Sequence, residues 1–375
     1  MRMVGRKRYS IAQALRYVTY LMAPLLVAAC GAGPAESRLQ DYQARLARTL
    51  QLELPIQSES ELARFPRPRD LVAKPVTATI DLIELWSLRD CALHGLIANK
   101  NSSLGRVSLS STKLFHELDF LRLLPACLKQ LEISGRDELS TALEQVGNAK
   151  RERLPSFIWQ ALLGGQEYRD YWNLPQQVPD YDAAAGAPAQ QAAQALIILA
   201  QAWLKNDYRV DRAAVETHLK KMRFGNAGVL QKSLILQHNY LSSLDVATKV
   251  RLAERPICFS AGGAPAPVID NVVRKYFVGE LQPWSVQLQK GIAQLQAAQQ
   301  LEALLALGEP EAFQSWRLKR DELLEIASGA PRRHVQSLLP VLEQCGLSPG
   351  QAPAAYPQKM SNRSDLGLPT TTPGT

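Results

Sequence analysis

Three polar side chains in the first third of the chain, His94, Asn101 and His116, are the main candidates for chemistry. His116 opens the run His116–Asp119, which lacks the second histidine that a zinc-binding helix places four residues later. His116 and Glu117 are adjacent, and adjacent helical residues do not face the same side, so an acid–base pair is not expected. The run therefore predicts a solvated helix face. His94 lies one turn before the loop with Asn101, so a polar pocket is the functional interpretation and a structural histidine the alternative.

Other catalytic motifs are weak or missing. Glu59-Ser60 matches a dipeptide in which lytic transglycosylases carry their single acid–base glutamate, but their Gly-Leu-Met-Gln element is absent and Glu59 lies in a Pro-flanked irregular stretch. There is no Gly-x-Ser-x-Gly elbow and no phosphate-cradling loop. The cluster of Tyr168, Tyr171 and Trp172 could stack on a sugar, although packing at a domain junction is the simpler interpretation. The sequence predicts no catalytic residue, cofactor, metal or nucleotide.

The first thirty residues, which end at Cys30, have the pattern of a targeting signal. The basic residues Arg2, Arg6, Lys7, Arg8 and Arg16 come first, and Tyr17–Ala29 follows as thirteen residues without charge. This pattern is typical of a secretory signal and is shorter than the ~20 residues that span a bilayer. Small residues leading into cysteine resemble the lipobox of bacterial lipoproteins. That resemblance implies removal of residues 1–29 and acylation of Cys30 with palmitate.

Removal of this signal changes the charge argument. The whole chain has 43 Lys and Arg against 35 Asp and Glu, a net charge of +8. Without the five basic residues of the signal, 38 basic and 35 acidic residues remain, a net charge of +3. Nucleic-acid binding needs a clustered basic face, so we expect no nucleic-acid partner and a mixed, solvated surface.

The remaining cysteines fit an oxidising compartment. If Cys30 is acylated, Cys91, Cys127, Cys258 and Cys345 form an even set, and disulfides persist after export. Four cysteines allow three pairings. Their positions favour a local bridge in each half, Cys91–Cys127 and Cys258–Cys345, and buried free thiols are the alternative.

Helical periodicity dominates the mature chain. Leu39, Tyr42, Leu46 and Leu50 form one stripe. Further helices are expected over about 79–98 and from 110 to a break or kink at Pro125. A new helix is expected to start at Ser242, and a kink at Pro340. No period-two alternation is convincing, so the chain is predicted to be all-α, a multi-helix globular domain with little or no sheet.

Composition suggests the domain organisation. Residues 30–35 would be a short tether, 36–172 an N-terminal helical lobe, 173–190 a Pro- and Ala-rich linker, 191–347 a C-terminal helical lobe and 348–375 a disordered tail. The two lobes could equally form one large domain.

Several motifs resemble a known family. They are Cys91–Ala98 leading into Asn101-Ser102-Ser103-Leu104-Gly105, then Arg255–Cys258, and finally His334-Val335 with Cys345-Gly346-Leu347. Together these are similar to proteobacterial putative lipoproteins classed as domain of unknown function 3080. The resemblance implies that two cysteine pairs belong to the fold, and it brings no activity, substrate or catalytic residue.

These observations favour a non-enzymatic accessory or binding protein of the cell envelope. It would be held by its lipid at the periplasmic face of the outer membrane, because glycine rather than aspartate follows Cys30. A membrane and an envelope protein are the expected partners. The alternative is a periplasmic enzyme acting on cell wall or lipid, such as a lytic transglycosylase.

Overall fold

The computed structural model describes residues 33–56, 62–71, 88–101 and 109–347. These residues form helices and no strand, which confirms the all-α prediction. The α-helices are α2 (Pro34–Leu50), α4 (Leu93–Asn101), α6 (Ser110–Ile133), α7 (Asp137–Leu162), α8 (Gln166–Tyr171), α9 (Ala187–Leu204), α10 (Arg212–Arg223), α11 (Ala227–Glu254), α12 (Ala266–Val272), α13 (Gln282–Leu304), α14 (Glu311–Ser328) and α15 (Ala330–Gln344). Single turns of 3-10 helix are η2 (Pro68–Leu71), η3 (Ala183–Gly186) and η5 (Ala306–Gly308), and a π-helical segment, η4 (Val273–Leu281), joins α12 to α13.

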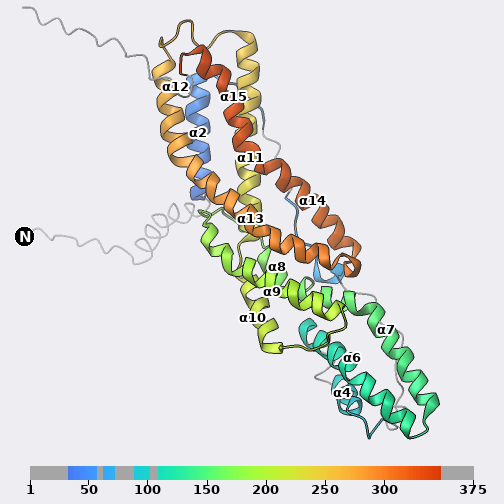
Figure 1. Cartoon of the computed structure of the whole chain (residues 1–375). Helices are drawn as coiled ribbons and strands as arrows, with labels where there is room; N and C mark the ends of the chain where they lie inside the picture. Colours follow the sequence, from blue (N-terminus) through green and yellow to red (C-terminus); the bar gives the residue numbers. More distant parts are fainter. Residues whose placement is uncertain (1–32, 57–61, 72–87, 102–108, 348–375) are drawn as a thin grey trace, which may run out of the picture.

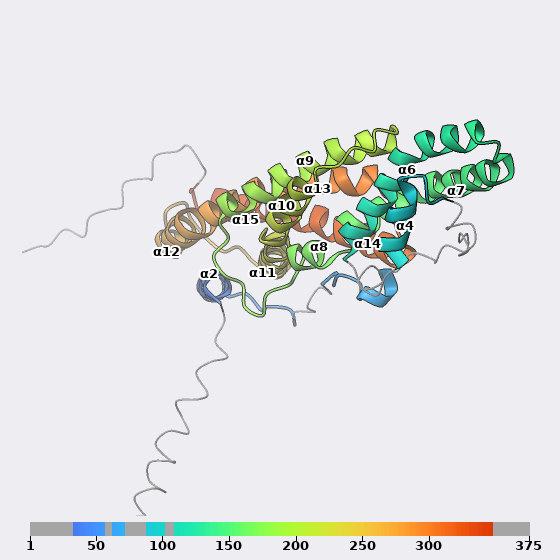
Figure 2. The ribbon, with the colours of Figure 1, turned by 90° about the horizontal axis from the view of Figure 1, so that it is seen from below.

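The described part of the molecule is elongated. In Figures 1 and 2, α2, α12 and α15 lie at one end and the α6–α7 hairpin lies at the other. Helices α9, α13 and α14 cross the middle. One continuous cluster of buried apolar side chains runs from Ala35 to Cys345.

Helix α2 follows the predicted stripe. Leu39, Tyr42, Leu46 and Leu50 are all buried. Their partners are α11 and α12, so the first helix packs on elements from the C-terminal half of the chain. The lobes proposed from composition stay a prediction. The stretch 173–190 holds a loop, η3 and the start of α9, with Val178 and Tyr181 buried.

Two predicted helix boundaries are wrong. Helix α6 does not end at Pro125 and no new helix begins at Ser242, because α6 and α11 continue through these residues. Helix α15 also continues through Pro340, and the kinks expected at Pro125 and Pro340 stay predictions. An internal proline costs a helix about 3 kcal/mol, and in α6 buried side chains on both sides of Pro125 offset that cost. Tertiary packing therefore overrides local propensity here.

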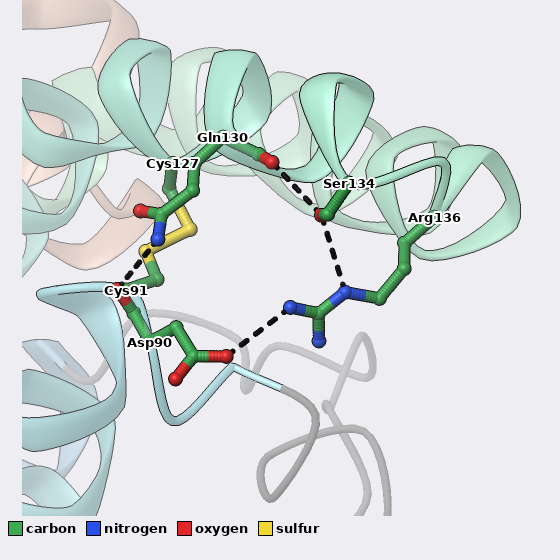
Figure 3. The surroundings of a disulfide bond; sticks show 6 residues. All are labelled: Asp90, Cys91, Cys127, Gln130, Ser134 and Arg136. Atoms are coloured by element: carbon green, nitrogen blue, oxygen red, sulfur yellow. Dashed lines mark hydrogen bonds and ion pairs between the residues drawn. A yellow bond between two sulfur atoms is a disulfide. The ribbon is translucent and has the colours of Figure 1, made fainter.

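The first disulfide joins Cys91 to Cys127, with Cα atoms 5.5 Å apart. The predicted helix over 79–98 is not continuous, because α4 begins only at Leu93 and Cys91 lies in the turn before it. This turn lets Cys91 reach the middle of α6. Gln130 Nε2 donates to the Asp90 carbonyl at 2.9 Å beside the bridge (Figure 3).

The second disulfide joins Cys258 to Cys345, with Cα atoms 5.1 Å apart. Cys258 lies in the loop between α11 and α12, and Cys345 caps the end of α15. Gln344 Oε1 accepts from the backbone N–H of Ile257 at 2.6 Å. The bridge therefore closes the end of the molecule that contains α2, α12 and α15 (Figure 1).

A buried arginine lies at the centre of the aromatic core. Arg320 is 0 % exposed, and its guanidinium lies 4.5 Å from the ring centroids of both Trp172 and Trp316. It donates to the two carboxylate oxygens of Glu302 at 2.6 and 2.7 Å, and the Tyr168 hydroxyl donates to the same carboxylate. Burial alone would lower the pKa of Arg320, but the charge of Glu302 raises it. This network joins α8, α13 and α14.

The aromatic cluster that could have stacked on a sugar belongs to this core. Tyr168, Tyr171 and Trp172 are each at most 5 % exposed. Their role is therefore packing, as the simpler interpretation held.

Within the described residues, no helix is long and apolar enough to cross a membrane.

Candidate functional site

The predicted polar pocket involves two packed helices, α4 and α6. His94 lies half-buried on α4, and Asn101 is the last residue of that helix, with its side chain outside the described residues. His116 lies on α6, and its Nδ1 is buried without a hydrogen-bond partner among the described residues. Desolvation, followed by the charges of Arg212 and Lys100, lowers the pKa of His116. A pocket of His94, Asn101 and His116 stays a prediction, and the cations around His116 are what the structure adds.

The run after His116 is not a solvated face. Glu117 is 2 % exposed and accepts from Lys100 Nζ and Lys150 Nζ, each at 2.5 Å. Burial works to raise the pKa of the Glu117 carboxyl, but the charges of Lys150 and Lys100 outweigh it and hold the pKa below 4.5. The carboxylate thus ties α4, α6 and α7 together. The sequence predicts a solvated position for Glu117 because it does not reveal the two lysine partners.

Replacement of Glu117 by Gln should lower the free energy of unfolding by about 2 kcal/mol at neutral pH, because two cations lose their acceptor. The folded pKa of Glu117 lies below its unfolded value, so its contribution is present above about pH 4.5 and is lost as pH falls through the folded pKa. The gap between wild type and variant should therefore narrow in acid. Urea unfolding at a series of pH values measures it, with Glu144→Gln at an exposed position of α7 as the control. A gap independent of pH would contradict the ion-pair account.

Asp119 extends the same network toward α10. It is 9 % exposed and accepts from Arg122, with NH2 to Oδ1 at 2.9 Å, and from Arg212 at the start of α10. Burial of both Glu117 and Asp119 corrects the prediction for this run. The carboxylates are buried because basic residues from four helices surround them.

A pocket of about 660 Å³ opens beside this network. Helix α6 contributes Leu121, Arg122 and Pro125, helix α7 contributes Arg151, and the loop between α9 and α10 contributes residues 205–209. Four of the lining residues are cations and one is an anion: Arg122, Arg151, Lys205, Arg209 and Asp207. The lining therefore carries a net charge of +3, as large as that of residues 30–375 together. Basic charge is thus clustered at this pocket, and the expectation of a mixed surface elsewhere stays a prediction.

The loop that forms one wall is held by its own hydrogen bonds. Asn206 adopts a left-handed conformation with φ of 68°, which asparagine tolerates better than most residues. The Trp203 indole N–H donates to the Arg209 carbonyl at 3.0 Å, and the Tyr208 hydroxyl donates to Asn206 Oδ1 at 2.6 Å. The Asp207 backbone N–H donates to the Ala202 carbonyl at 3.0 Å. These bonds fix the wall before any ligand arrives.

Sequence reasoning missed this pocket because its cations come from segments far apart in the chain. A usable signal was present in Lys205-Asn206-Asp207-Tyr208-Arg209, a turn-forming run with two cations between two predicted helices. Arg122 and Arg151 could not have been added, because their approach depends on how α6 and α7 pack. The other candidate for catalysis, Glu59-Ser60, lies outside the described residues.

A family model described as protein of unknown function (DUF3080) matches residues 39–349. The chain belongs to the DUF3080 family. No curated protein and no solved structure matches it. The DUF3080 region contains both disulfides and the basic pocket.

The DUF3080 region also contains a buried Tyr–His–Asp chain. His334 on α15 is 0 % exposed, and it lies 2.6 Å through Nδ1 from Asp245 Oδ1 and 2.7 Å through Nε2 from the Tyr42 hydroxyl. Burial and the charge of Asp245 raise the pKa of Tyr42 well above its usual value, so the phenol keeps its proton. The imidazole of His334 links this phenol to the Asp245 carboxyl group through its two ring nitrogens. The chain joins α2, α11 and α15.

Access to this triad is limited to its carboxylate. The Asp245 side chain is 20 % exposed and borders a smaller, mainly apolar pocket of about 390 Å³ between α11 and α15. The phenol and the imidazole are enclosed. Among the described residues, no group of three or more His, Cys, Asp or Glu side chains could hold a metal.

Proposed function

We propose that this DUF3080 protein is a lipid-anchored binding protein of the bacterial cell envelope. Its signal would be removed, Cys30 acylated and the helical body held at the periplasmic face of the outer membrane. It would work with an envelope partner or ligand and carry out no chemistry itself. Cys30 lies outside the described residues, so the support for anchoring comes from the signal sequence and from the first residues that the structure describes.

The observation that carries the proposal is the position of Gly33. This residue is buried, and a Cβ atom on it would lie 2.5 Å from the Val178 carbonyl oxygen. Gly33 therefore belongs to the folded body. Three residues of chain reach at most about 11 Å, so the Cα of an acylated Cys30 would lie within that distance of the Gly33 Cα. Such a body would lie directly on a bilayer surface, with no long linker between lipid and fold.

A binding role is favoured over catalysis by the two polar arrangements. The Tyr42–His334–Asp245 chain most resembles an acid–base set, but its histidine is fully enclosed and both ring nitrogens have partners. A general acid or base must reach the proton that it transfers. The basic pocket, by contrast, is open and preformed. An accessible, positively charged pocket that is not combined with an acid–base set supports a role in ligand binding.

Replacement of Cys30 by Ser should abolish palmitate labelling and release the protein from membranes. The physical reason is that the acyl chains supply the hydrophobic anchor. Labelling in growing cells followed by membrane fractionation measures both effects. The double variant Cys91→Ser/Cys127→Ser is the control and should keep its label, because its Cys30 is intact.

A second variant tests the choice of membrane. By analogy with lipoprotein sorting, Gly31→Asp should move the protein from the outer to the inner membrane on density-gradient separation. Continued palmitate labelling of Cys30→Ser would overturn the anchoring proposal. An unchanged distribution of Gly31→Asp would overturn the outer-membrane assignment alone.

A further inference from the structure

The basic pocket holds more positive charge than its neighbours neutralise. Arg209 is paired with Asp207, at 2.8 and 2.6 Å, and Arg122 shares Asp119 with Arg212. Arg151 donates to the neutral Asn148 side chain at 2.6 Å, and neither Arg151 nor Lys205 has a carboxylate partner in the described ranges. A concave site lined by one sign of charge raises the local concentration of the opposite ion. The positive charge that has no carboxylate partner therefore favours binding of an anion.

The cations of the pocket come from three separate elements of the chain. Arg122 comes from α6, Arg151 from α7, and Lys205 and Arg209 from the loop after α9. A guanidinium binds a phosphate or carboxylate through a planar fork, and an ammonium acts as a point charge. Cations that line one pocket can hold separate oxygens of one ligand.

Part of the remaining lining is apolar and fits the body of a larger ligand. Besides the polar Asn206, the uncharged lining residues are Leu121, Pro125 and Tyr208. The pocket volume of about 660 Å³ falls in the range of sites that take organic ligands. Because the hydrogen bonds of residues 202–209 already fix the loop, little conformational entropy would be lost on binding.

We propose that this pocket binds a phosphorylated ligand that carries at least two negative charges and an organic body. Phosphate fits better than a single carboxylate, because it brings more charge and more acceptor oxygens to a lining of net charge +3. The body would pack on Leu121, Pro125 and Tyr208. The same chemistry occurs in a phosphorylated lipid headgroup and in a soluble phosphate compound. The inference goes beyond the anchoring proposal and does not depend on acylation of Cys30.

Calorimetric titration of the purified full-length protein in neutral detergent tests this site. The soluble probe is inorganic pyrophosphate, and the headgroup probe is dihexanoyl phosphatidic acid. The test variant is Arg151→Gln/Lys205→Gln, which removes the two cations without carboxylate partners. The matched control is Arg48→Gln/Lys290→Gln, which removes one arginine and one lysine at exposed positions on other helices.

Binding of either probe should weaken on the order of tenfold or more in the test variant, equivalent to about 1.4 kcal/mol or more, and should stay unchanged in the control. Added salt should weaken wild-type binding. Tighter binding of phosphatidic acid would identify a lipid headgroup, and tighter binding of pyrophosphate a soluble compound. Absence of binding by both probes would overturn the proposal. Equal binding by the test variant would do the same, provided that its melting temperature matches that of the wild type.

Discussion

Glu302→Gln should cost about 3–5 kcal/mol of the free energy of unfolding, because it leaves the Arg320 guanidinium charged and without its main partner in the core. Arg320 is 0 % and Glu302 1 % exposed, so water cannot replace the lost carboxylate. The remaining charged neighbour is Asp321, whose Oδ1 lies 2.7 Å from Arg320 NH2 and whose side chain is 34 % exposed. Glutamine keeps the shape of glutamate, so the measured loss would report charge rather than volume. Urea unfolding measures this loss in the free energy of unfolding, with the same slope m assumed for the wild type and the variant.

Two further variants separate charge from packing. Asp41→Asn removes a carboxylate from the exposed pair of Asp41 and Arg45 on α2, and should change the free energy of unfolding much less than Glu302→Gln does, because water screens the pair. The triple variant Tyr168→Phe/Glu302→Leu/Arg320→Met replaces the whole polar group with apolar side chains and should recover most of the lost stability. A loss in Glu302→Gln no larger than in Asp41→Asn would show that the buried pair does not stabilise the core.

The same network marks the limit of prediction from sequence. The stripe of α2 could be predicted, because helical periodicity is a local property and its residues are buried as expected. Glu302 and Arg320 are 18 residues apart, and Tyr168 is 134 residues from Glu302. Charged residues are usually exposed, so no local rule places these in the core. Only the packing of α8, α13 and α14 brings the partners together.

The predicted helix boundaries at Pro125 and Ser242 are wrong for a related reason. Pro125 and Ser242 are local signals for a break, and the helices α6 and α11 override them. The stability of a helix in a protein comes mainly from its packed face rather than from intrinsic propensity. The basic pocket shows the same limit for a site, since one wall could be recognised in residues 205–209 and the other two depend on α6 and α7. The spacing of residues along the sequence therefore predicts single helices and short connecting segments. It does not predict sites that are assembled from several elements.

Removal of the Cys258–Cys345 bridge should cost about 4.6 kcal/mol in the chain-entropy account, and removal of Cys91–Cys127 about 3.8 kcal/mol. The difference arises because Cys258 and Cys345 are 87 residues apart in sequence and Cys91 and Cys127 only 36, so the longer loop gains more freedom in the unfolded chain. The test uses the double variants Cys258→Ala/Cys345→Ala and Cys91→Ala/Cys127→Ala, which leave no unpaired thiol. Non-reducing peptide mapping first establishes the pairing.

The two variants also control for each other in thermal unfolding. Without reductant, each variant should have a lower melting temperature than the wild type, because it lacks the stabilisation of its missing bridge. Reductant should lower the melting temperature of the wild type. The Cys258 variant should be the less stable of the two, since its bridge fixes the end of α15 to the loop before α12, whereas Cys91 lies in a short turn already held by Gln130 and Arg136. An inverted order would show that native contacts at the first bridge outweigh loop length. Four free thiols in the wild type would refute the disulfides themselves.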